Sequence, residues 1–94
     1  MPDVTTSRIS GTVSDASGAQ LPGVTVTATN EESGAQSPAV TDERGFYRTL
    51  NLPTGIYNIT ATLEGFVPAT AVNVRLLLGS TPTVNFTLQT ASVS

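Results

Sequence analysis

The chain has 94 residues, 38% of them hydrophobic and 12% charged, with a formal net charge of −3. This length suits a single domain with one core, and the acidic balance excludes a nucleic-acid binder, which needs a clustered basic face. No apolar run reaches the ~18 residues of a membrane-spanning helix, and cysteine is absent, which excludes disulfides and thiolate chemistry.

Apolar residues recur at every second position in the first part of the chain, which predicts strands with one inward face. A first strand is expected over residues 8–14. The chain then turns, because Pro22-Gly23 fits the middle of a type II turn. The inward positions of this strand and of the one after the turn are Ile9, Gly11, Val13, Val24, Val26 and Ala28.

The middle of the chain predicts a weak edge strand and a hairpin. Residues 39–41 resemble a short strand, and Pro38 argues for an edge because proline cannot donate a ladder hydrogen bond. Residues 42–45 read as a hairpin loop closed by Gly45 in the left-handed region. A strand over residues 46–52 is expected to follow.

A Pro/Gly corner comes next, formed by Leu52, Pro53, Gly55 and Tyr57. In Greek-key sandwiches, a tyrosine just past such a corner sends its hydroxyl back to a backbone group a few residues upstream. The sequence therefore predicts a structural role for Tyr57. Extended segments are expected over residues 57–63, 66–76 and 84–88, with Val72, Val74 and Leu76 on one face.

About seven short strands result, separated by turn signals roughly every 8 to 12 residues. This spacing favours an all-β sandwich over a helical or α/β fold. The assignment of strands to sheets does not follow from one sequence, since nonlocal contacts set partner and register.

Three segments together resemble the carboxypeptidase regulatory-like domain family. They are ISGTVSDASGAQLPGVTVTATN, TDERGFYRTLNLPTGIYNITATLEGF and VNVRLLLGSTPTVNFTL. The family is similar to transthyretin and to the B-type repeats of adhesins, so the resemblance implies a seven-stranded Greek-key sandwich of the prealbumin type. It also implies that Tyr47 points inward and Phe46 outward. We expect residues 8–89 to form this domain, with a flexible segment at 1–7 and a linker at 90–94.

One subset of the family is more similar still: the N-terminal domain of some bacterial outer-membrane transporters that depend on the energy-coupling protein TonB. The shared features are the SGAQLPGVTVT opening and the VNVRLLLGSTPTVNFTL ending. This resemblance implies a bacterial cell-envelope location on the periplasmic side of the outer membrane. A secreted or cell-surface location is the alternative.

The chemistry of related families fails on missing residues. Transthyretin-like hydrolases use histidines, and adhesin repeats need a lysine for their isopeptide bond, but this chain has neither residue type. The acidic pairs Glu31-Glu32 and Asp42-Glu43 lack the alternating oxygen ligands of a calcium loop, so we interpret them as solvated turn carboxylates. We therefore expect no catalytic residues, no cofactor and no metal.

Four residues are candidates for an interface. Leu76, Leu77 and Leu78 break the alternation, so at least one of them faces away from the main core or packs beneath a loop; a strand covered on both faces or a bulge near Gly79 is an equal explanation. Phe46 is the fourth candidate, with an ordinary sheet-surface contact as its alternative.

Taken together, these features predict a non-catalytic accessory domain of a larger envelope protein, serving as a spacer or protein-contact module. The alternative is a carbohydrate- or peptide-binding module of a secreted or surface enzyme such as a peptidase. The expected partners are the other domains of the parent protein, a periplasmic or surface protein, or a glycan. We expect no nucleic-acid binding, no direct membrane insertion and a monomer in isolation.

Overall fold

The computed structural model describes residues 6–91, which form seven strands and no helix. The part of the chain so described thus holds no helix that could span a membrane. The strands are β1 (Thr6–Asp15), β2 (Thr25–Asn30), β3 (Gln36–Val40), β4 (Phe46–Pro53), β5 (Gly55–Thr62), β6 (Ala69–Leu76) and β7 (Phe86–Leu88).

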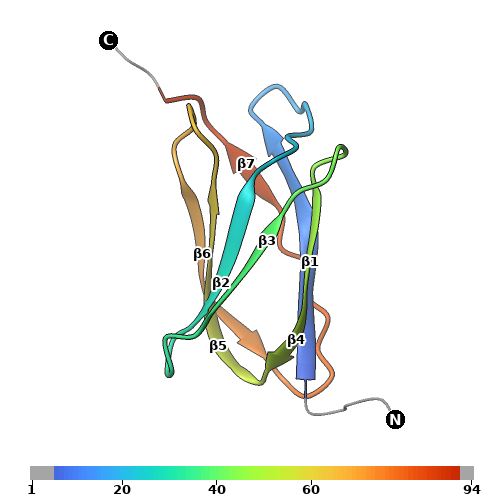
Figure 1. Ribbon diagram of the computed structural model, residues 1–94, viewed down its shortest axis with the longest axis vertical. Helices are drawn as coiled ribbons and strands as arrows, with labels where there is room; N and C mark the ends of the chain where they lie inside the picture. The colour runs from blue at the N-terminus through green and yellow to red at the C-terminus, as the bar shows by residue number, and fades with distance from the viewer. Residues whose placement is uncertain (1–5, 92–94) are drawn as a thin grey trace.

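The strands form two facing sheets (Figure 1). The smaller sheet has the order β4-β1-β7 and the larger one β3-β2-β5-β6. All neighbours pair antiparallel except β1 and β7, which run parallel. The predicted all-β, seven-stranded, prealbumin-like Greek-key sandwich is therefore confirmed.

The core lies between the sheets and follows the predicted alternation. Tyr47 of β4 is 1% exposed and its ring packs against Phe86, with ring centroids 6.3 Å apart. The prediction that Tyr47 points inward while Phe46 points outward is confirmed, because Phe46 is 41% exposed. The other fully buried side chains come from both sheets and include Ile9, Val13, Val24, Val26, Leu52, Ile59, Leu76 and Leu88.

One glycine is required by a close approach of two backbones. A Cβ atom on Gly11 would lie 1.9 Å from the carbonyl oxygen of Val84. The same oxygen accepts the hydroxyl of Tyr47 in a short hydrogen bond. Gly11 thus allows the segment before β7 to lie against β1, where the N–H of Val84 donates to Ser10 at 2.8 Å.

The Pro/Gly corner between β4 and β5 is confirmed. The Tyr57 hydroxyl donates to the carbonyl of Pro53 at 2.8 Å, four residues upstream. Leu52 is 1% exposed, and Gly55 begins β5 with φ of 152°. The four residues therefore anchor the crossing from one sheet to the other.

The prediction that Val72 shares an inward face with Val74 and Leu76 is wrong. Val72 is 62% exposed, because Asn73 has a φ of 58° and the β5–β6 register shifts beside it. This bulge reverses the alternation within β6, so Ala71 points inward before it and Val74 after it.

The starts of five strands also differ from expectation. β1, β3 and β5 begin earlier than the expected residues 8, 39 and 57, at Thr6, Gln36 and Gly55. β6 and β7 begin later than the expected residues 66 and 84, at Ala69 and Phe86. Pro38 does lie on an edge strand, as predicted. Residues 1–5 and 92–94 of the expected flexible segment and linker lie outside the described residues.

Candidate functional site

The predicted leucine run divides between the core and the surface. Leu76 is 1% exposed, so its assignment to an interface is wrong: as the last residue of β6 it points between the sheets. Leu77 and Leu78 are 61% and 62% exposed. Two large apolar side chains are thus exposed side by side.

A tight turn holds these two leucines in place. The Ser80 N–H donates to the Leu77 carbonyl at 2.9 Å, and the Leu77 N–H donates to the Ser80 hydroxyl oxygen at 2.9 Å. The Ser7 hydroxyl, on β1, donates to the same Leu77 carbonyl at 2.6 Å. Gly79 supplies the positive φ of 74° that the turn requires. We call residues 77–80 the leucine turn.

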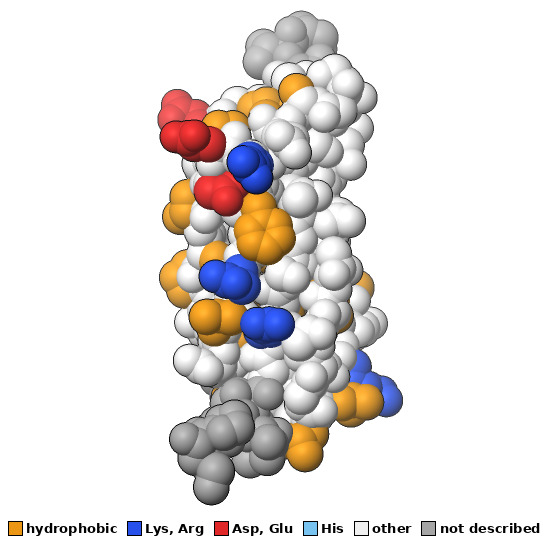
Figure 2. Space-filling view, turned by 90° about the vertical axis from the view of Figure 1, so that its right-hand side faces the viewer, with side chains coloured by type: hydrophobic (Ala, Val, Ile, Leu, Met, Phe, Trp, Pro, Cys, Tyr) orange, Lys and Arg blue, Asp and Glu red, His pale blue; other side chains and the backbone are white. Residues whose placement is uncertain are grey.

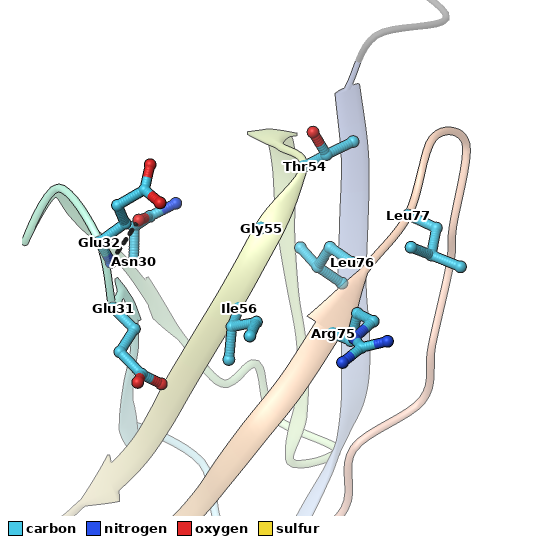
Figure 3. Close-up of a pocket in the computed structure, with 9 residues that line it drawn as sticks. All are labelled: Asn30, Glu31, Glu32, Thr54, Gly55, Ile56, Arg75, Leu76 and Leu77. Atoms are coloured by element: carbon cyan, nitrogen blue, oxygen red, sulfur yellow. Dashed lines mark hydrogen bonds between the residues drawn. The ribbon is translucent and has the colours of Figure 1, made fainter.

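A groove lies beside the leucine turn, at one end of the larger sheet. Its volume is about 720 Å³, and it is open to solvent. Figure 3 shows the β2–β3 turn with Asn30, Glu31 and Glu32 on one side and the end of β6 with Arg75 and Leu77 on the other. Ile56 of β5 lies between the two sides and is 37% exposed. We call this the end groove.

Opposite charges stand on the two sides of the end groove. The Glu31 N–H donates to the Ile56 carbonyl at 2.8 Å, and Ile56 is paired with Arg75 across the β5–β6 ladder. Glu31, Ile56 and Arg75 therefore form a row of acidic, apolar and basic side chains. This arrangement can orient a partner that has both charges and an apolar group.

Phe46 lies on a different surface. It pairs with Thr12 of β1, whereas the leucine turn is bound to Ser7 of the same strand. Five residues of strand separate these points by roughly 17 Å. The structure therefore does not bring Phe46 together with Leu77. Figure 2 shows the side of the molecule that carries β1 and β4, where apolar and basic side chains alternate.

The acidic turns have structural roles. The Asp42 carboxylate accepts the N–H groups of Phe46 at 3.0 Å and Arg44 at 2.8 Å, which holds its pKa below the usual range. Asp15 likewise accepts the Ser17 hydroxyl at 2.6 Å, and this bond with others lowers its pKa. The pairs Glu31-Glu32 and Asp42-Glu43 belong to no possible metal site, since the described residues contain no group of three His, Cys, Asp or Glu side chains that could hold a metal ion.

Two surface features are absent from the sequence-based expectations. The end groove combines residues from three separate segments, so no local pattern could have located it. The row of Phe46, Arg48 and Leu50 on β4 was detectable, because the period of two places all three on one strand face.

Fold and sequence together assign the chain to a family. Residues 8–89 match the Carboxypeptidase regulatory-like domain. The chain belongs to this family, and the predicted resemblance is confirmed. A curated relative is the TonB-dependent transporter Oar of Myxococcus xanthus, which is 39% identical over 83 residues. That match covers 87% of this chain but only 8% of the transporter.

Solved structures share the fold at low sequence identity. A cohesin–X-dockerin complex from Acetivibrio cellulolyticus matches with a TM-score of 0.68 and 21% identity, over 87% of this chain and 56% of that one. The Bacillus anthracis TIE protein matches with a TM-score of 0.68 and 22% identity, over 92% and 17%. Catechol 1,2-dioxygenase from Pseudomonas arvilla matches with a TM-score of 0.71 and 14% identity, over 99% and 55%. These likenesses show the fold alone.

Proposed function

We propose that this chain is a non-catalytic accessory domain of a bacterial envelope protein, a TonB-dependent outer-membrane transporter, in which it serves as a protein-contact module. The leucine turn carries the proposal, because two leucines more than 60% exposed are fixed there by hydrogen bonds. The similarity to part of a TonB-dependent transporter supports the envelope location. The partner in this proposal is another domain of the parent protein.

The turn has the physical properties of an interface anchor. Burying one leucine side chain contributes about 1.5–3 kcal/mol relative to leaving it exposed. Little conformational entropy is lost at the backbone on binding, because Ser7 and Ser80 already hold Leu77 in place. The end groove next to it adds Glu31 and Arg75, whose opposite charges favour one orientation of the partner.

Site-specific cross-linking in the parent protein tests this proposal. The chain contains no cysteine, so Leu78→Cys introduces the domain's single thiol for a photoactivatable label. Thr70→Cys is the matched control, because it is also exposed but lies on β6 away from the leucine turn. We expect cross-links to neighbouring domains of the transporter from the label at position 78 and few from position 70.

Three outcomes would contradict the proposal. Equal cross-linking from both positions would show no preferred contact surface. A native reading frame that encodes a peptidase or a free-standing enzyme would remove the transporter context. Saturable binding of a glycan or peptide by the isolated chain, with no domain contact, would favour the ligand-binding module instead.

A further inference from the structure

The sandwich has edge strands of very different character. In the larger sheet, β3 is an edge, and just beyond its end the Thr41 N–H donates to the carbonyl of Val24, which precedes β2, at 2.9 Å. The β2–β3 ladder alternates, so Pro38 falls at an outward-facing position, where it has no N–H to offer. The opposite edge, β6, is interrupted by the bulge at Asn73. Both edges resist an added strand.

The edge of β4 is regular from Phe46 to Thr49, and its register shifts only beyond that point, where Asn51 has a φ of 59°. The Val13 N–H donates to the Gly45 carbonyl at 2.8 Å, so the backbone at Gly45 faces β1. Antiparallel ladders alternate, and Tyr47 and Thr49 are therefore the β4 residues that exchange hydrogen bonds with β1. The residues that alternate with Tyr47 and Thr49 along β4 direct their backbone groups away from β1.

Those outward residues are Phe46, Arg48 and Leu50. Both backbone groups of Phe46 are used by Asp42, whose carboxylate accepts the N–H at 3.0 Å and whose N–H donates to the carbonyl at 2.9 Å. The N–H and C=O groups of Arg48 and the N–H of Leu50 face the open edge of the sheet in the described part of the chain, because the regular pairing with β1 extends to Thr49. These three groups can pair with an added strand.

The side chains beside this open edge define the partner. Phe46 is 41% and Leu50 49% exposed, and Arg48 stands between them on the outer face. Three of the chain's four arginines, Arg8, Arg44 and Arg48, are exposed on β1, on β4 or in the preceding turn. Figure 2 shows basic and apolar groups along this side, with acidic side chains at its upper end.

We propose that the β4 edge binds an extended segment of a protein partner that carries an acidic residue between two apolar ones, each two positions apart. Side chains directly opposite each other on paired strands have Cβ atoms roughly 5 Å apart. The acidic residue would thus face Arg48, and the apolar residues would face Phe46 and Leu50. This contact needs neither Leu77 nor Leu78, so the inference does not rest on the proposed function, although Leu50 lies beside Gly79 and Ser80 of the leucine turn.

A second copy of this chain fits the edge poorly. If two copies paired symmetrically through their β4 edges, the β4 side chains of one copy would lie beside the same side chains of the other. The arginines of one copy would then approach those of the other, and like charges on facing strands are destabilising. The charge on this edge therefore favours an acidic segment of a different sequence.

A peptide titration of the 94-residue chain tests the proposal. The probe is the acetylated, amidated peptide TVTETVT, and the control TVTKTVT reverses its one charge. Backbone amide shifts and hydrogen exchange are followed by NMR on the labelled chain. We expect slower exchange at the amides of Arg48 and Leu50 with the first peptide, and binding about threefold to tenfold weaker for the second.

Two further changes separate charge from backbone pairing. Arg48→Gln removes the charge and keeps the N–H, whereas Arg48→Pro removes both and imitates Pro38 on β3. We expect the first variant to weaken binding and the second to abolish it. A TVTETVT peptide that is N-methylated at the residues whose N–H groups would face β4 tests backbone pairing without altering the protein. We expect this peptide not to bind.

Several results would overturn the proposal. They are equal affinity for the two peptides, unchanged binding by the N-methylated peptide, protection confined to β3 or β6, and no amide shift at millimolar peptide. Self-association of the chain through β4 at high concentration would also overturn it, because the occupant would then be a second copy.

Discussion

Replacement of Gly11 by alanine adds one methyl group where two backbone segments of the sandwich lie close together. The new Cβ would lie 1.9 Å from the carbonyl oxygen of Val84 and 2.6 Å from its carbonyl carbon. Both are backbone atoms, so no side-chain rotation relieves the overlap. Reaching an ordinary contact of 3.4 Å requires the Val84 segment to move by about 1.5 Å, the difference between 3.4 and 1.9 Å.

This movement breaks interactions that hold the segment against β1. The Val84 carbonyl accepts the hydroxyl of buried Tyr47, and Thr12 donates its N–H to the Asn85 side chain at 2.9 Å. Overpacking costs about 1–3 kcal/mol, and a buried hydroxyl without its partner costs about 1–3 kcal/mol. Alanine recovers only about 0.5–1 kcal/mol over glycine within a strand. We therefore expect a loss of about 1–5 kcal/mol in unfolding free energy.

Urea unfolding followed by circular dichroism measures this loss, with Gly65→Ala as the control. That alanine would meet nothing within 4 Å, although the φ of 88° strains it, so we expect about 1–2 kcal/mol there. A double-mutant cycle with Tyr47→Phe adds a second criterion: Gly11→Ala should couple with it, and Gly65→Ala should not. A loss below about 1 kcal/mol for Gly11→Ala, or strict additivity with Tyr47→Phe, would refute the reasoning.

Three other substitutions test the polar contacts. Tyr57→Phe deletes the 2.8 Å bond to a backbone carbonyl and should lower stability by about 1–2 kcal/mol in urea at an unchanged m-value. Thr41→Val removes the hydroxyl that accepts the Val24 N–H at 2.9 Å; we expect a loss of about 1–3 kcal/mol and faster exchange of that amide. The hydrogen bond from the Phe46 N–H is the main cause of the lowered pKa of Asp42. The ionised Asp42 carboxylate therefore stabilises the fold at pH values above its unfolded pKa of about 4, and this stabilisation is lost as the pH falls through its lower pKa in the folded state. Asp42→Asn should flatten the acid side of a thermal-midpoint profile, and an identical slope in both proteins would contradict this.

The candidate surface could be predicted only in part. The broken alternation of the leucine run indicated that some of its members face outward, and Leu77 and Leu78 do so. The pattern did not reveal that Leu76 is the one in the core, because that depends on where β6 ends. The bulge at Asn73 had the same effect on Val72, since a single positive φ reverses the facing of the residues around it.

The sequence by itself determined the local structure of this protein: the strand period, the turns at Pro22 and Gly45, and the corner at Tyr57. These features depend on neighbours in the chain, on the restricted φ of proline and on the freedom of glycine. The hairpin expected at residues 42–45 is nevertheless wrong, because the turn at Gly45 joins β3 and β4, which lie in different sheets. Tertiary structure alone decided that β4 is an open edge and that Val84 lies against Gly11. Both follow from which strands pair, and pairing joins residues far apart in the chain through backbone groups that are the same at every position.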